Sequence, residues 1–273
     1  AVLPGQNYTS ADRDTLWGIY SSEYRVLTNV PVAIAAAIGT AMVTSISADH
    51  VRGFYDTIRF KARAAIKFNM IIAIPSAVGM AVLAYPINVL LFNDRYKLSS
   101  YILMLGSASI VFFAYSTVTT AILQGINRLK TPVINSAISL GIHVVLVYLI
   151  LKFTGLSTYA LVIGNVTFPL VVSILNWYQL ERHLGYKQEM IKSFVIPIAS
   201  AGIMGVATYF IYKGLYSLSG SMLIGTLVSI LLSVIIYFIL LVIFRGVNED
   251  EIRQLPKGYV FVSILKRLHL LKG

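Results

Sequence analysis

Seven windows without any Asp, Glu, Lys or Arg divide this chain of 273 residues. They are 20 to 31 residues long and cover positions 26–48, 68–93, 98–127, 131–151, 153–180, 193–212 and 214–244. A helix needs about 20 mostly apolar residues to cross a bilayer, so each window is long enough. All 22 basic and 11 acidic residues lie outside the windows. The pattern predicts an all-α polytopic membrane protein and excludes a soluble enzyme, a disordered chain and a nucleic-acid-binding domain.

The basic residues are divided unequally between the two sides of the membrane. If successive connections alternate sides, one side receives sixteen Lys and Arg residues and the other receives six. Cytoplasmic loops carry the excess of Lys and Arg. We therefore expect a multi-pass protein with its N-terminus outside and its C-terminus in the cytoplasm. The net charge of +11 then faces membrane lipids, and no nucleic-acid partner is expected.

The windows also set the expected domain boundaries. An exterior segment, 1–24, precedes a bundle of five spans in 25–180. These spans lie near 26–48, 68–93, 98–124, 131–151 and 155–178. A cytoplasmic loop, 181–192, leads to two additional transmembrane helices in 193–246 and an amphipathic cytoplasmic tail, 247–273.

Two local features add to this outline. Ala35 and Gly39 are four residues apart in the first span and form a surface that lets another helix approach closely. The connection 49–67 mixes basic and apolar residues, so we expect it to lie along the lipid headgroups. The chain begins with Ala1 and shows no signal peptide before its exterior segment. We therefore expect the C-terminal part of a longer protein.

Signatures of catalysis are absent from the sequence. There is no nucleotide-binding glycine loop, no zinc-protease or serine-hydrolase motif and no Cys. No carboxylate lies inside a window, although hydrolytic chemistry or ion coupling within the membrane would need one. We therefore predict no enzyme activity, no catalytic residue, no metal and no cofactor.

Polar side chains at helical spacing mark particular faces of three spans. The polar series contain Arg25 and Asn29 in the first span, Gln124 at the end of the third, and Asn135, Ser139 and His143 in the fourth. Such faces either form hydrogen bonds between helices or line a cavity. His143 is accordingly either a packing histidine or a group for gating or proton coupling.

Arg25 is the sharpest candidate for a binding residue. It follows Glu23 and Tyr24 at the outer end of the first span. It could anchor the helix at the interface with its charged end in water. Alternatively, it could point into a cavity, where its planar guanidinium group would bind a phosphate or pyrophosphate. The residue types leave both interpretations open.

Three stretches carry a resemblance to a known family. They are SEYRVLTNVPVAIAAAIGTAMVTSISADHVRG, FNMIIAIPSAVGMAVLAYPINVLLF and AILQGINRLKTPVINSAISLGIHVVLVYLIL. In order and spacing the chain resembles the C-terminal half of the MurJ/SpoVB-type polysaccharide-biosynthesis transporters, which belong to the multidrug/oligosaccharidyl-lipid/polysaccharide (MOP) exporter superfamily. The ending YFILLVIFRGVNEDEIRQLPKG is similar to the SpoVB-like branch of that family.

The resemblance implies a MATE-like lobe, incomplete at its start, followed by two extra C-terminal helices. It implies a bacterial cell membrane protein whose missing N-terminal lobe forms the other half of a cationic cavity. The implied activity is alternating-access translocation of an undecaprenyl-pyrophosphate-linked saccharide, such as lipid II, from the inner to the outer leaflet. Arg25 aligns with a cavity arginine of the family pattern, and Glu23 stands where that pattern has an acid.

Other functions remain open. Within transport, the chain could belong to a flippase for another lipid-linked polysaccharide or to a drug antiporter of the same superfamily. From a different class, it could be a non-transporting scaffold that holds an envelope-synthesis complex together through its basic inner loops. Replacing Arg25 by Ala distinguishes a transporter from a scaffold. The change should abolish flipping, but it should leave scaffolding intact, because a scaffold would not need a cavity arginine.

Overall fold

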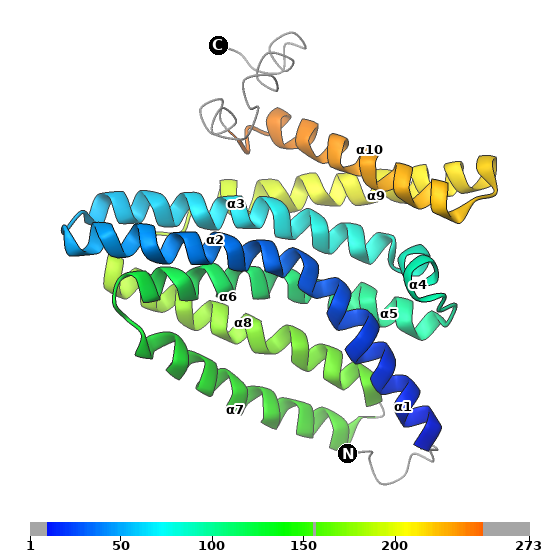
Figure 1. The fold of residues 1–273 in the computed structure, drawn as a ribbon, viewed down its shortest axis with the longest axis horizontal. Helices are drawn as coiled ribbons and strands as arrows, with labels where there is room; N and C mark the ends of the chain where they lie inside the picture. The colour runs from blue at the N-terminus through cyan, green and yellow to red at the C-terminus, as the bar shows by residue number, and fades with distance from the viewer. Residues whose placement is uncertain (1–9, 155–156, 248–273) are drawn as a thin grey trace. The chain divides into compact units, whose positions relative to one another are not determined.

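The computed structural model of the chain describes residues 10–154 and 157–247, and these residues form helices without any strand (Figure 1). The tail predicted for 247–273 lies outside the described residues except for its first position. The helices in chain order are α1 (Ser10–Gly18), η1 (Ile19–Tyr24), α2 (Arg25–Val51), α3 (Tyr55–Val82), α4 (Ala84–Phe92), α5 (Lys97–Gly106), α6 (Ala108–Gly125), α7 (Lys130–Phe153), α8 (Ser157–Leu184), η2 (Ile191–Val195), α9 (Ile196–Ser219) and α10 (Met222–Ile243).

Seven of the helical stretches are long and apolar enough to cross a membrane, which confirms the predicted fold class. Their ends differ from the ends of the charge-free windows. The first runs without interruption from Asp14 through η1 to Val51, so helix begins well inside the predicted exterior segment. The second ends at Val82, and α4 forms a separate short helix after Leu83.

Most of the stretch 49–67, which we expect along the headgroups, is helical in the structure. Only residues 52–54 separate α2 from α3, and Gly53 adopts φ +75, a conformation that glycine allows at no steric cost. Lys67, which the sequence placed in this connection, is 4% exposed within α3. It lies twelve residues after Tyr55, or about 18 Å along the helix axis.

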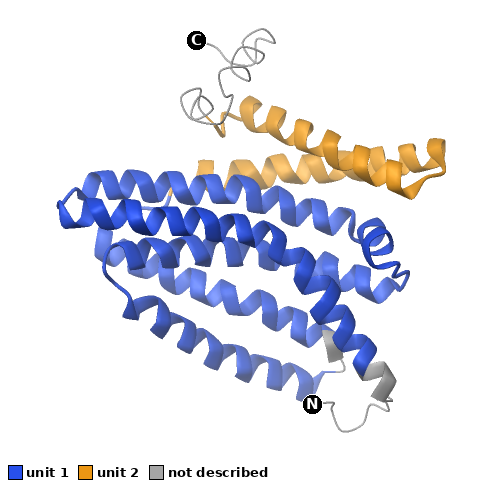
Figure 2. Ribbon diagram, in the orientation of Figure 1, with its two compact units in different colours: residues 1–188 blue, residues 189–273 orange. Residues whose placement is uncertain are grey.

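The chain divides into two compact units, residues 1–188 and 189–273 (Figure 2). At the centre of the first unit lies α6, which contacts α2, α3 and α8. Its residues Ile110, Ala114, Val118 and Ile122 recur every four positions and are fully buried. In contrast, α7 packs mainly on α8 and exposes most of its apolar side chains.

The small residues predicted to allow a close helix approach do so against α6. Ala35 and Gly39 are both buried. A Cβ atom added at Gly39 would lie 3.3 Å from the Cβ of Ala121, so the two backbones approach closely there. This contact confirms the prediction and sets the packing of α2, the helix that carries Arg25.

The second unit contains a hairpin of α9 and α10. The hydroxyls of Thr208 and Ser233 lie 2.6 Å apart and join the two helices in their buried contact. Gly220 adopts φ +64 and ends α9, as a left-handed residue commonly does at a helix C-terminus. These helices occupy the part of the chain where the sequence places two additional spans.

Candidate polar cavity face

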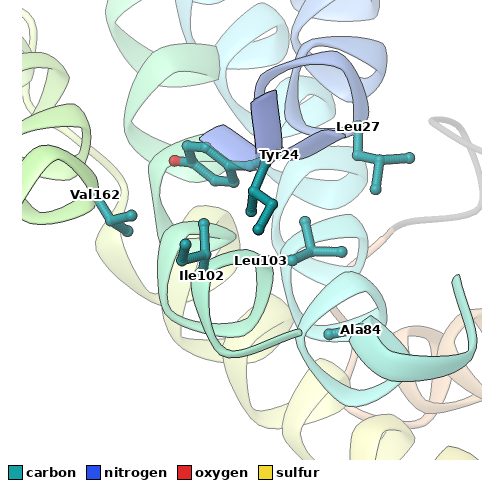
Figure 3. Close-up of a cluster of buried hydrophobic side chains, with 7 residues drawn as sticks. Tyr24, Leu27, Ala84, Ile102, Leu103 and Val162 are labelled. Atoms are coloured by element: carbon teal, nitrogen blue, oxygen red, sulfur yellow. The ribbon is translucent and has the colours of Figure 1, made fainter. Parts of the chain in front are cut away.

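The start of α2 is held by the side chain of Tyr24, which is 1% exposed. Its hydroxyl donates to the carbonyl of Gly106 at 3.1 Å, lies 3.0 Å from Ser109 Oγ, and accepts from Asn165 Nδ2 at 2.6 Å. Figure 3 shows the ring among Ile102, Leu103 and Val162. One side chain of the first span therefore contacts α5, α6 and α8.

The backbone on both sides of this contact is adapted to it. Gly106 leaves room for the ring, because an added Cβ would lie 2.6 Å from Tyr24 Cζ. Tyr24 also ends η1, a stretch of π-helix, a form frequent at functional sites. Thr28 donates back to the carbonyl of Tyr24 at 3.0 Å, a bond that often bends helices. The direction of α2 is thus set immediately beside Arg25.

Because Tyr24 points inward, the next residue points out of the bundle. Arg25 is exposed and forms no ion pair with any described residue. Asn29, four residues later, is exposed on the same face of α2. Ala36 and Thr40 continue that face along the helix, since they follow at helical spacing.

This face of α2 leads into a groove of about 350 Å³. Helices α6, α7 and α8 complete it with hydroxyl, amide and aromatic side chains, none of them ionisable. The lining residues are Ala36, Gly39, Thr40, Val43, Phe113, Ser116, Thr117, Thr120, Ala121, Gln124, Ser136, Phe168 and Val172. Of the sequence candidates, Gln124 lies in the groove, while Arg25 and Asn29 lie farther along the same face of α2.

Glu23 does not belong to this face. It lines a separate pocket of about 660 Å³ with Asp94, Arg95 and Tyr96 of the α4–α5 connection. Asp94 lies close enough to Glu23 for the charges of the two carboxyl groups to act on each other. The structure therefore places the two acidic groups together and gives Arg25 no carboxylate partner among the described residues.

The polar series of α7 faces α8 at every position. Ser139 Oγ donates to the carbonyl of Phe168 at 2.6 Å, and His143 Nδ1 lies 2.9 Å from the carbonyl of Gly164. Asn135 Nδ2 donates to Asn176 Oδ1 at 2.8 Å. These three candidates hydrogen-bond α7 to α8.

Sequence reasoning missed the partners of these groups. Asn176 is fully buried and also donates to Thr119 and Thr120 at 3.1 and 3.0 Å. Asn165 likewise donates a hydrogen bond from its side-chain amide to the hydroxyl of Tyr24. Both asparagines lie in the fifth charge-free window, and a search of the windows for uncharged amides, as well as for charges, would have found them.

The arrangement offers a guanidinium group and a row of hydroxyl and amide groups on the described part of the first unit. In the described part of the chain, no three His, Asp or Glu side chains gather as metal ligands would. Seven helices of membrane-spanning length that carry an exposed arginine and a hydroxyl-lined groove define a polytopic membrane protein with polar surface on its helices.

Comparison with known proteins identifies the family. The sequence profile of the lipid II flippase MurJ family matches residues 20–233, so the chain belongs to the MurJ family. It is 25% identical over 185 residues to the lipid II flippase MurJ of Bacillus subtilis, covering 66% of this chain and 34% of that protein. It is also 25% identical over 214 residues to the probable lipid II flippase MurJ of Bdellovibrio bacteriovorus, covering 75% of this chain and 40% of that protein. The chain thus matches well under half the length of these curated relatives.

Proposed function

We propose that this chain forms the second lobe and the two additional helices of a bacterial flippase. Its cargo is an undecaprenyl-pyrophosphate-linked saccharide, lipid II or a related envelope precursor, moved from the inner to the outer leaflet. The observation that carries this proposal is the family match over residues 20–233. In this arrangement residues 25–180 form the lobe, and the two helices in 193–246 follow it.

The polar face of α2 supports binding of such a cargo. The exposed guanidinium group of Arg25 has no internal partner in the described residues, so its planar set of donors is free to bind pyrophosphate oxygens in pairs. The groove beyond it offers hydroxyl and amide groups that suit a saccharide, Gln124 and Thr120 among them. The charged site at Arg25 then matches the pyrophosphate of a lipid-linked sugar, and the neutral polar groove matches its saccharide.

The mechanism we propose is alternating access between two lobes. A first lobe, supplied by other residues of the same protein, closes over the polar face of α2 from one side of the membrane and then from the other. The excess of basic residues favours an orientation with the N-terminal end of α2 toward the outside. Arg25 then binds the pyrophosphate near the outer end of the translocation path.

The test is the exposure of lipid II on the outer leaflet of cells depleted of the native protein. We expect the complete reading frame to restore exposure, the frame with Arg25→Ala to fail, and this chain alone to fail. Arg52→Ala is the matched control, because Arg52 is an exposed arginine just past the other end of α2. Rescue by Arg25→Ala would favour a scaffold over a flippase. Exposure that survives depletion would mean either that lipid II is not the cargo or that a second flippase is present.

A further inference from the structure

Two phenylalanine rings form part of the groove beside α2. They are Phe113 of α6 and Phe168 of α8, two helices that pack against each other (Figure 1). The ring centroids lie 6.4 Å apart, with an angle of 42° between the ring planes. Both side chains are half-buried, so part of each ring stays open to the groove. We call this pair the aromatic wall. It adds apolar ring surface to a groove whose other polar groups are hydroxyls and amides.

The contacts behind the aromatic wall hold it in place. The ring of His143 meets that of Phe168 edge-on, with centroids 6.2 Å apart and an interplanar angle of 81°. Ser139 Oγ donates to the carbonyl of Phe168 at 2.6 Å. Ser173 Oγ donates to the carbonyl of Phe112 at 3.1 Å and so joins α8 to α6 beside the other ring. The aromatic wall is therefore fixed by three helices of the unit itself.

The aromatic wall lies at the end of the groove nearest to Tyr24. The hydroxyl of Tyr24 contacts Ser109 of α6 and Asn165 of α8. Phe113 and Phe168 follow these two residues by four and three positions, which is about one helical turn, or 5 Å along each axis. The two rings therefore lie between the start of α2, with its exposed arginine, and the polar residues farther along α6.

Three polar side chains in the rest of the groove have unused hydrogen-bonding groups. Thr117, Gln124 and Ser136 form no side-chain hydrogen bond with a described residue. Deeper in the same bundle such groups are paired, as Asn135 is with Asn176. A lipid acyl chain in the groove would leave the three groups unsatisfied, which is costly in hydrocarbon. The groove therefore suits an occupant that has hydrogen-bonding groups of its own as well as a surface that packs on aromatic rings.

We propose that the aromatic wall stacks on the sugar ring next to the pyrophosphate of the cargo, and that Thr117 and Gln124 bind polar groups farther along the saccharide. A pyranose ring has C–H bonds on its faces and hydroxyl groups around its edge. The face of an aromatic ring is negative and attracts the partial positive charge of C–H bonds. The inference rests on the proposed function, since it assigns a site to the saccharide of the same cargo. Recognition then depends on the sugar as well as on the pyrophosphate.

Binding of two lipids to the complete protein in nanodiscs tests the aromatic wall. Lipid II carries pyrophosphate and saccharide, whereas undecaprenyl pyrophosphate lacks the saccharide. We expect Phe168→Leu to weaken binding of lipid II by roughly 2- to 10-fold, as the loss of one aromatic contact does, and to leave binding of undecaprenyl pyrophosphate unchanged. Phe168→Tyr keeps the ring and should retain most of the binding. Arg25→Ala should weaken binding of both lipids. Phe210→Ala, at an exposed phenylalanine of α9, should affect neither.

The results separate this inference from the proposed function. If the unmodified protein binds neither lipid, the proposed cargo is wrong and the aromatic wall has no sugar to bind. If it binds both lipids equally well, the pyrophosphate cargo stands and the sugar site is overturned. An equal loss of both lipids with Phe168→Leu would also overturn the sugar site, because the ring would then only support the fold. If Phe168→Leu does not fold, Gln124→Ala decides: a loss confined to lipid II supports the site, and unchanged binding overturns it.

Discussion

Two polar series with the same helical spacing have different surroundings in this molecule. Asn135, Ser139 and His143 on α7 all hydrogen-bond to α8. Arg25 and Asn29 on α2 are exposed on a face that continues into a groove. Spacing identifies which residues share a face of a helix. Whether that face binds a neighbouring helix or a ligand depends on the element that covers it, and the covering element comes from elsewhere in the chain.

The comparison predicts large losses of stability on one face and small ones on the other. Asn176→Ala removes the oxygen that accepts from Asn135 and the amide group that donates to Thr119 and Thr120. These groups are buried or partly buried, so we expect a loss of about 2–3 kcal/mol in the free energy of unfolding. Asn29→Ala, at an exposed position, should change it by less than about 0.5 kcal/mol. Denaturant unfolding in detergent micelles measures both. Equal losses would mean that the α2 face is covered as fully as the α7 face.

The orientation of the α2 face depends on the contact between Gly106 and Tyr24. Gly106→Ala places a methyl group against the tyrosine ring, so we expect a loss of about 1–3 kcal/mol from overpacking. Gly141→Ala is the matched control, because an added Cβ there meets nothing within 4 Å. That substitution should stabilise α7 by up to about 1 kcal/mol. Thermal unfolding of both variants measures the two changes in stability. An unchanged stability of Gly106→Ala would contradict the tight contact between Gly106 and Tyr24.

The hydroxyl of Tyr24 has a smaller and more specific effect. Tyr24→Phe keeps the ring and removes three polar contacts, so we expect a loss of about 1 kcal/mol. Because the chain has no Cys, a spin label at Arg25→Cys reports the local motion directly. The label should gain mobility in the Tyr24→Phe background, while a label at Asn29→Cys should not. Unchanged mobility at both positions would show that the phenol does not orient Arg25.

The smallest effect distinguishes two serines of one helix. Ser139 donates to the carbonyl of Phe168 on α8, whereas Ser136 lines the groove. Hydrogen bonds between membrane helices contribute about 0.6 kcal/mol on average, so Ser139→Ala should lose about that much and Ser136→Ala less. Unfolding measured on the two variants in parallel resolves the difference. The reverse order would mean that the groove, and not the α8 contact, is the tightly packed side.

Hydropathy predicts the seven membrane-spanning helices because an apolar stretch of that length has few other stable environments. It does not predict where the helices end, since backbone hydrogen bonding continues past the first charged residues. Asp49 and Lys61 illustrate this, because their ion pair lets both charges lie within helices where the windows suggest a loop.

The candidate site was predictable to a similar extent. The sequence singles out Arg25, Asn29 and Gln124, and the structure places them on one face of α2 and in its adjoining groove. It does not reveal that Glu23 turns toward Asp94, because the α4–α5 connection that carries Asp94 is distant in sequence. The anchoring roles of Asn165 and Asn176 also depend on contacts across more than 50 residues. Long-range pairings of this kind leave no local pattern.

The π-helical stretch η1 lies between α1 and α2, and it changes the direction in which the side chains of α1 point relative to those of α2. A π-helical turn accommodates one residue more than an α-helical turn, and one residue corresponds to about 100° of rotation about the axis. The hydrogen bonds of Tyr24 fix the rotation of α2 about its axis. The extra residue therefore changes the rotation of α1 and not that of α2. The rings of Trp17, Tyr20 and Tyr24 contact one another in series, so the aromatic row crosses η1 and ends on the residue that positions Arg25. A one-residue deletion between Ile19 and Ser22 would rotate α1 and leave Arg25 pointing in its present direction.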